Sequence, residues 1–142
     1  MKLYEEKKEY LLKLQEFKCA SCNHEFKAHD KIDLAHKLKA SKKNYELFSE
    51  LVIDHVNNLA ATHSGDCNDA QNCSRASNPV RATEIIIEIL THLIQGEPDT
   101  DTIYILKNAF NNLIECNTDS HIHIGMYDIL ANFFEAYQDY NK

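Results

Sequence analysis

The sequence predicts a mostly helical α+β protein, in which a small metal-binding core with a lead-in helix precedes a three-helix extension. Two pairs of potential metal ligands, Cys19 with Cys22 and His63 with Cys67, flank a segment with short apolar runs. Beyond residue 78, apolar residues recur at helical spacing in three consecutive stretches. We therefore expect a metal ion to hold the first part of the chain and helix packing to hold the second.

The composition bounds the class of protein. A chain of 142 residues suits one domain, or a small domain with a helical extension. No apolar run approaches the length of a membrane span, and the charged N-terminal residues do not resemble a secretory signal. Five cysteines without such a signal indicate metal or redox chemistry and not a disulfide framework. We expect a cytoplasmic protein with no membrane partner.

The charge is unevenly distributed along the chain. Residues 1–45 carry 11 Lys and Arg against 7 Asp and Glu, a local charge of +4, and the remainder carries 4 against 15, a local charge of −11, which together give the net −7. The basic part is concentrated between Lys27 and Lys43, and Lys37, Lys39 and Lys42 within it are candidate contacts to nucleic-acid phosphates. The alternative is that these lysines form an ordinary solvated face.

The first helix is expected over residues 2–17. Its apolar residues lie close to one stripe, which predicts that this stripe packs on the core. The members of the stripe are Leu3, Tyr10, Leu11, Leu14 and Phe17.

The middle of the chain is expected to alternate between strands and short helices. Ile32 to Leu38 predicts a strand that places His36 near its end, and the spacing after Ser41 predicts a helical turn or two. An extended segment is expected over residues 52–56, before the turn signal at Asn57 and Asn58. A short helix carrying Asn68 is expected over residues 67–75.

Three helices are expected to follow. Asn78 with Pro79 begins the first, Gly96 ends it, and Pro98 to Asp101 connects to the second and caps it. Asp119 and Ser120 begin the third, whose aromatic residues predict a core or a seam with another protein or a second copy. We therefore divide the chain into a zinc-binding domain with its N-terminal helix, residues 1–77, and a helical extension, residues 78–142.

The two ligand pairs predict a structural zinc site formed by Cys19, Cys22, His63 and Cys67. Zinc in structural sites takes four such ligands in a tetrahedron. Cys73 is an alternative to His63 as the fourth ligand. A redox role for Cys19 and Cys22 is disfavoured because the pair follows a helix and does not open one.

The order of these residues resembles that of the HNH (His-Asn-His) nucleases. It runs from the CxxC pair through a histidine at the end of an apolar strand and an Asn-Leu step to a ligand pair ending in Cys67-Asn68. The resemblance covers residues 19 to about 79. It implies a ββα-metal, treble-clef-like core in which Cys19, Cys22, His63 and Cys67 form a zinc knuckle.

The resemblance also implies roles in phosphodiester hydrolysis. His36 would match the general base that activates water, Asn58 the residue that orients it, and Asn68 a ligand of a catalytic Mg²⁺ or Mn²⁺. The sequence departs from the family pattern at Ala35, where active members often carry an aspartate, and Asp33 lies three residues before His36. Two functions therefore stay open: an HNH-type endonuclease, and a non-catalytic zinc module of the same fold that binds nucleic acid or a protein.

Overall fold

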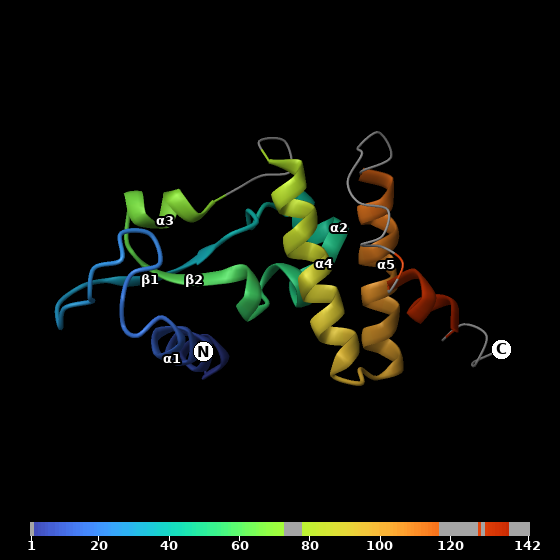
Figure 1. The fold of residues 1–142 in the computed structure, drawn as a ribbon, viewed down its shortest axis with the longest axis horizontal. Coiled ribbons are helices and arrows are strands. Elements are labelled where there is room, and N and C mark those ends of the chain that lie inside the picture. Colours follow the sequence, from blue (N-terminus) through green and yellow to red (C-terminus); the bar gives the residue numbers. More distant parts are fainter. Residues whose placement is uncertain (1, 73–77, 117–127, 129, 137–142) are drawn as a thin grey trace.

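The computed structural model describes residues 2–72, 78–116, 128 and 130–136 (Figure 1). Within this part of the chain the protein is α+β and mostly helical, as predicted. No helix among these residues combines the length and apolar character needed to cross a membrane. The elements in order are α1 (Lys2–Leu14), β1 (Ile32–His36), α2 (Lys42–Ile53), the 3₁₀ turn η1 (Val56–Asn58), β2 (Leu59–His63), α3 (Asp66–Gln71), α4 (Pro79–Gln95) and α5 (Thr100–Cys116).

The two strands form one antiparallel pair. The register sets Ile32 opposite His63 and His36 opposite Leu59. Because side chains alternate along a strand, Leu34 and His36 share one face of the sheet, while Asp33 and Ala35 share the other. The face carrying Leu34 packs with Leu11 of α1, and the other face lies against α3. This alternation decides which candidate site residues can meet.

The extended segment expected at residues 52–56 is wrong. Val52 and Ile53 instead complete α2, after a break at Ser49, whose φ of 72° and ψ of 162° are not helical. The chain then turns through η1, and the second strand begins only at Leu59. Burial against α4 and α5 stabilises Val52 and Ile53 as helix, overriding the preference of β-branched residues for strands.

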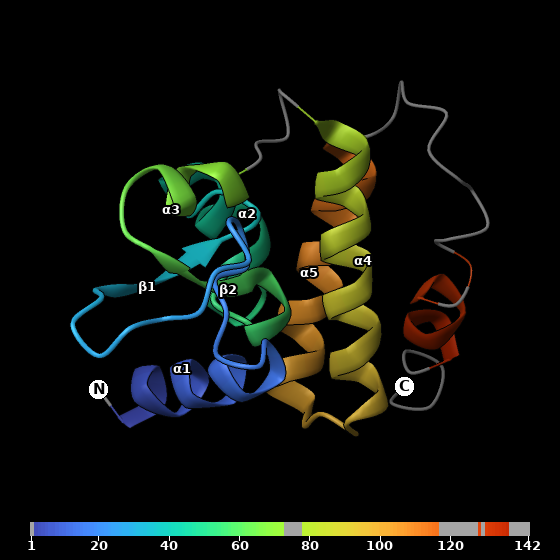
Figure 2. The ribbon, with the colours of Figure 1, turned by 60° about the vertical axis from the view of Figure 1, so that its left-hand side comes forward.

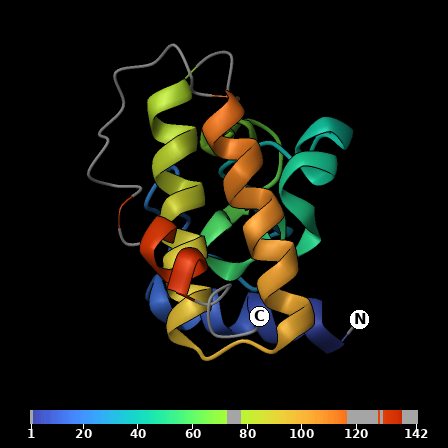
Figure 3. The same ribbon diagram turned by 90° about the vertical axis from the view of Figure 1, so that its right-hand side faces the viewer.

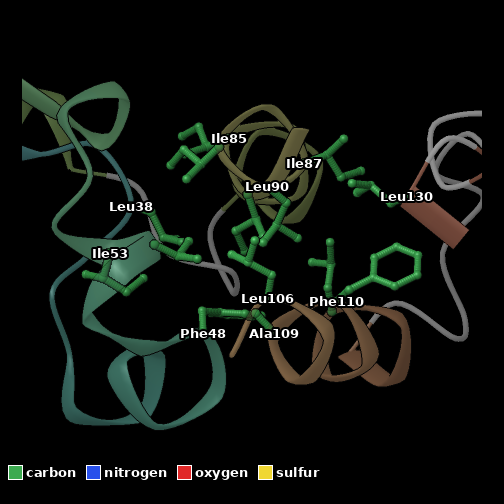
Figure 4. Close-up of a cluster of buried hydrophobic side chains, with 14 of the residues drawn as sticks. Leu38, Phe48, Ile53, Ile85, Ile87, Leu90, Leu106, Ala109, Phe110 and Leu130 are labelled. Atoms are coloured by element: carbon green, nitrogen blue, oxygen red, sulfur yellow. The ribbon is translucent and has the colours of Figure 1, made fainter. Parts of the chain in front are cut away.

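The main hydrophobic core joins residues from both sides of position 77. Leu38 and three side chains of α2 (Phe48, Val52 and Ile53) pack with α4 and α5. Figure 4 shows Leu38, Phe48 and Ile53 in this cluster. Asn112 of α5 also donates a hydrogen bond to the Leu47 carbonyl of α2, at 2.8 Å. Figures 1 and 2 show α4 and α5 side by side, with the two-stranded sheet to one side of them. The helices therefore complete the core of the segment that carries the ligand pairs.

The signals for the helix ends are confirmed in α4 and α5. Asn78 caps α4 by accepting a hydrogen bond from the Arg81 N–H, and Gly96 follows its last residue. Asp99 accepts from the Thr102 N–H at the start of α5. Residues 128 and 130–136 are helical and lie against the α4–α5 pair (Figure 3). The expected start of this helix at Asp119 and Ser120 lies outside the described residues.

Helix α1 differs from its prediction in length and in which side chains it buries. It ends at Leu14, and Glu16 and Phe17 follow with positive φ angles of 56° and 59°. Leu11 is buried against Leu59 and Ala61, whereas the rest of the predicted packing stripe is exposed. The expectation that the whole stripe packs on the core is therefore wrong, because only its Leu11 flank meets the sheet.

Candidate metal centre

A tight turn after α1 presents the first two sulfur ligands. The Cys19 N–H donates to the His24 carbonyl at 2.9 Å, and the Asn23 N–H donates back to the Cys19 carbonyl at 2.9 Å. Asn23 has a φ of 63°, a conformation that asparagine tolerates better than most residues. These two hydrogen bonds therefore close the turn, and the turn brings the Cys22 sulfur close to the Cys19 sulfur.

The end of β2 and the start of α3 supply the other two ligands. His63 is the last residue of β2, and Cys67 lies in the first turn of α3. Gly65 between them has a φ of 79° and a ψ of −125°, which glycine adopts without the steric cost borne by other residues. This glycine lets the chain reverse so that Cys67 returns toward His63.

The structure brings the four predicted zinc ligands together. The ligand atoms of Cys19, Cys22, His63 and Cys67 all lie within 4.8 Å of one another, and His63 Nδ1 is 3.4 Å from Cys22 Sγ. In a tetrahedral zinc site with bonds of about 2.0–2.3 Å, ligand atoms are separated by roughly 3.3–3.8 Å. Three thiols and one imidazole in this spacing suit a structural metal such as zinc. The alternative ligand Cys73 lies outside the described residues.

Neighbouring groups hold the ligands in place. Asp30 Oδ2 accepts from His63 Nε2–H at 3.0 Å, which leaves Nδ1 facing the sulfurs. A carboxylate on the outer nitrogen of a metal-binding histidine fixes its tautomer and ring orientation. The Ser21 hydroxyl donates to the Cys67 carbonyl and accepts from Gln71 Nε2, so it ties the first turn to α3.

The pKa values of the ligand side chains are those expected where a bound cation would stabilise thiolates. Burial opposes ionisation of Cys19, but N–H groups of Cys22, His63 and Ser21 together lower the pKa of its thiol to about 6. The hydrogen bond that His63 donates to the Asp30 carboxylate is the main reason that the pKa of His63 is raised to about 9. Desolvation and the two neighbouring sulfurs raise the pKa of Cys67 to about 11. Without a cation the thiols therefore resist joint deprotonation, and a bound Zn²⁺ would stabilise all of them as thiolates.

His36 lies on the α1 face of the sheet, in a second polar cluster. Its Nε2–H donates to Asp54 Oδ1 at 2.9 Å, and the Tyr45 hydroxyl donates to the same oxygen at 2.7 Å. Desolvation and the Asp54 carboxylate raise the pKa of Tyr45 to about 12. The three residues line a cavity of about 340 Å³ together with Lys7 and Leu34. This arrangement fixes the orientation of the His36 ring through Nε2 and leaves Nδ1 outside the hydrogen bond to Asp54.

Asn58 is fully buried beneath the segment that follows His36. Its Oδ1 accepts from the Leu38 N–H at 2.8 Å, and its Nδ2 donates to the carbonyls of Leu38 and Ile53. The Asn58 carbonyl also accepts from the Lys37 N–H at 2.8 Å. Asn58 therefore holds the backbone of the two residues that follow His36.

Asn68 lies on the opposite face of the sheet from His36. Its Nδ2 is 3.4 Å from Asp33 Oδ2, between α3 and β1. Ala35, which shares this face, is buried. The structure therefore pairs His36 with Asp54 and Asn68 with Asp33, and does not place His36 and Asn68 around a common point.

The candidate phosphate contacts follow His36 directly. Lys39 and Lys42 are exposed and Lys37 is half-buried. The backbone beneath them is fixed, because Asn58 holds Lys37 and Leu38 and the Asn44 amide donates to the Lys39 carbonyl at 2.8 Å. Lys37 also lines a cavity of about 540 Å³ that includes Tyr10 and Arg81.

Two supporting residues were not predicted from the sequence. Asp30 is 33 positions from His63, and no local pattern links them. Tyr45 is an apolar-face position of α2 by spacing, and its hydroxyl bonds Asp54, nine residues further along, across the non-helical Ser49. Asp54 itself is close to His36 only in space.

No family model, no curated protein and no solved structure matches this chain.

Proposed function

We propose that this chain is a zinc-stabilised module with an HNH-like core that binds nucleic acid through the lysines after His36. The observation that carries the proposal is the position of Lys39, Lys42 and Lys43 on an anchored loop and the start of α2. The zinc site would hold the sheet to which this loop is attached.

The placement of the lysines conflicts with local helix energetics, which supports a binding role. The first turn of α2 carries Lys42 and Lys43 and no acidic residue, although the positive end of the helix dipole favours acidic residues there. Bound phosphate would remove this unfavourable interaction and would also meet the N–H groups of the first turn. The anchored backbone would present the ammonium groups with little ordering cost.

Binding of labelled single-stranded and duplex oligonucleotides at several salt concentrations tests the proposal. We expect Lys39→Ala with Lys42→Ala to weaken binding and to lower the salt dependence by about two released counterions. Lys27→Ala is the matched control, because Lys27 is equally exposed but lies in the loop before β1. Equal affinities for the double variant and the control, or no salt-sensitive binding by the wild type, would reject the proposal.

Phosphodiester hydrolysis is the second candidate, and the His36–Asp54 pair favours it. A neutral imidazole held by a carboxylate is an arrangement that serves general bases. The separation of Asn68 from His36 and the buried Ala35 weigh against a catalytic Mg²⁺ or Mn²⁺ bound in the HNH manner. We therefore rank hydrolysis below binding.

Plasmid nicking with Mg²⁺ or Mn²⁺ distinguishes the two functions. Hydrolysis requires that His36→Ala abolish nicking, whereas Lys27→Ala should leave it unchanged. Binding without nicking by the wild type would retain the module and exclude the nuclease.

A further inference from the structure

Helix α1 exposes an apolar stripe with the spacing of a coiled coil. Leu3, Tyr10 and Leu14 are 62%, 53% and 66% exposed, and Lys7 lies between them. The positions 3, 7, 10 and 14 alternate steps of four and three, the spacing of the a and d positions of a heptad. Large apolar side chains gathered on one exposed face mark an interaction surface.

The neighbouring flank of α1 is already used by the fold. Leu11 is buried against Leu59 and Ala61 of β2. The Lys7 ammonium donates to the Asp54 carbonyl at 2.6 Å, so its aliphatic stem is what the stripe presents between Leu3 and Tyr10. The stripe therefore lies beside the buried flank of α1 and stays exposed. Leu3 and Lys7 border a cavity that His36 also lines, and Tyr10 and Leu14 border one that Arg81 also lines.

We propose that this stripe binds the same stripe of a second copy, with the two α1 helices antiparallel. In an antiparallel pair an a position meets a d position of the partner, so Leu14 of one copy would meet Leu3 of the other, and Lys7 would meet Tyr10. A parallel pair would instead bring the two Lys7 residues together, which is repulsive.

The flanking charges are complementary only in the antiparallel arrangement. Glu6 and Lys13 both occupy g positions, and g positions face each other across an antiparallel pair. Each copy would thus contribute one Glu6 and one Lys13 to two equivalent ion pairs. Lys13 already lies 3.2 Å from Glu9 of its own helix, with both side chains exposed, so it remains accessible to a partner.

The size of the surface sets the strength of the association. A helix of 13 residues spans about 20 Å, so the contact is small beside a standard interface. The dimer is accordingly weak and concentration-dependent, and the monomer keeps its own core.

Sedimentation equilibrium from low micromolar to near-millimolar concentration tests the proposal on the full chain with zinc. We expect a reversible monomer–dimer equilibrium that Leu14→Glu abolishes. Tyr104→Glu on α5 is the matched control, because Tyr104 is 64% exposed and lies outside the stripe. Circular dichroism and zinc content of each variant establish that it is folded.

A charge exchange tests the orientation independently. Glu6→Lys and Lys13→Glu alone should each weaken the dimer by roughly fivefold, and the two together should restore it. A wild type that stays monomeric throughout, dimerisation that Leu14→Glu leaves intact, or single variants that the double variant does not rescue would each overturn the proposal.

Discussion

Asn58 connects two segments through one buried side chain. It satisfies the N–H and carbonyl of Leu38 and the carbonyl of Ile53, and none of these groups has water as an alternative. We predict that Asn58→Ala lowers the free energy of unfolding by about 2–4 kcal/mol, because it leaves buried backbone groups unpaired. Urea unfolding at saturating zinc measures the loss.

Asn57→Ala is the control for this prediction. Asn57 is the neighbouring half-buried residue, and only its backbone N–H is used, in a bond to His55 Nδ1. Its substitution should change the free energy of unfolding by less than about 0.5 kcal/mol. Similar losses of unfolding free energy in the two variants would show that the hydrogen bonds of the Asn58 side chain do not stabilise the fold.

His55 makes stability depend on pH. Burial, with smaller contributions from His92 and Lys7, lowers the pKa of His55 to about 4 from its ordinary value of 6.5. Between pH 4 and pH 6.5, His55 is therefore protonated in the unfolded chain and largely neutral in the folded chain. The contribution of His55 is complete above pH 6.5 and is lost as the pH falls toward 4, by at most about 1.4 kcal/mol per pH unit.

His55→Asn is the matched variant for the pH prediction. Asparagine can accept the Asn57 N–H as His55 Nδ1 does, but it does not titrate. Acid also displaces zinc in both proteins, so the difference between the two unfolding free energies isolates His55. A difference that stays constant from pH 7 to about 4.5 would contradict the assignment.

At the scale of elements, the metal site joins four separate pieces of chain. The turn after α1, the end of β2, the Asp30 loop and α3 meet at the ligand cluster. We predict one equivalent of zinc per chain. Chelation should unfold this region, because binding energy at such a site is folding energy.

Cysteine variants test the zinc site with a control from the same chain. Cys22→Ser should lower the zinc content to near zero after dialysis and remove hydrogen-exchange protection from residues 19–70. Cys116→Ser, at the end of α5, should retain zinc and protection. Full zinc content in Cys22→Ser, or none in the folded wild type, would exclude the site.

For the whole molecule, the core that joins α2 to α4 and α5 determines which fragments can fold. Leu38, Phe48 and Ile53 are fully buried in the same cluster as Leu90 and Leu106. We predict that residues 78–142 alone melt without a cooperative transition, because the apolar faces of their helices lose these partners. Circular dichroism across a thermal scan gives the measurement, with the full chain as reference. A sharp transition of the fragment would instead support an independent helical domain.

Much of the local structure followed from the sequence. The Asn78-Pro79 and Gly96 signals placed the ends of α4, and the short apolar run before His36 placed β1. The ligand spacing predicted which four side chains gather, because cysteine and histidine pairs in reversing turns have few other reasons to occur together. These features depend on residues that are near one another along the chain.

What only the tertiary structure decided was which faces meet. Spacing alone gave α1 a stripe to bury, yet Leu11 is the one member of that stripe that is buried against the sheet. Nothing local to Val52 and Ile53 distinguishes strand from helix, and their burial beside α4 and α5 decides it. The alternation of β1 sends His36 to Asp54 and Asp33 to Asn68, so residues three positions apart in sequence serve opposite faces. The sequence determined the ligands and the helix ends by local chemistry, whereas the contacts between elements were set by packing, which acts between residues far apart in the chain.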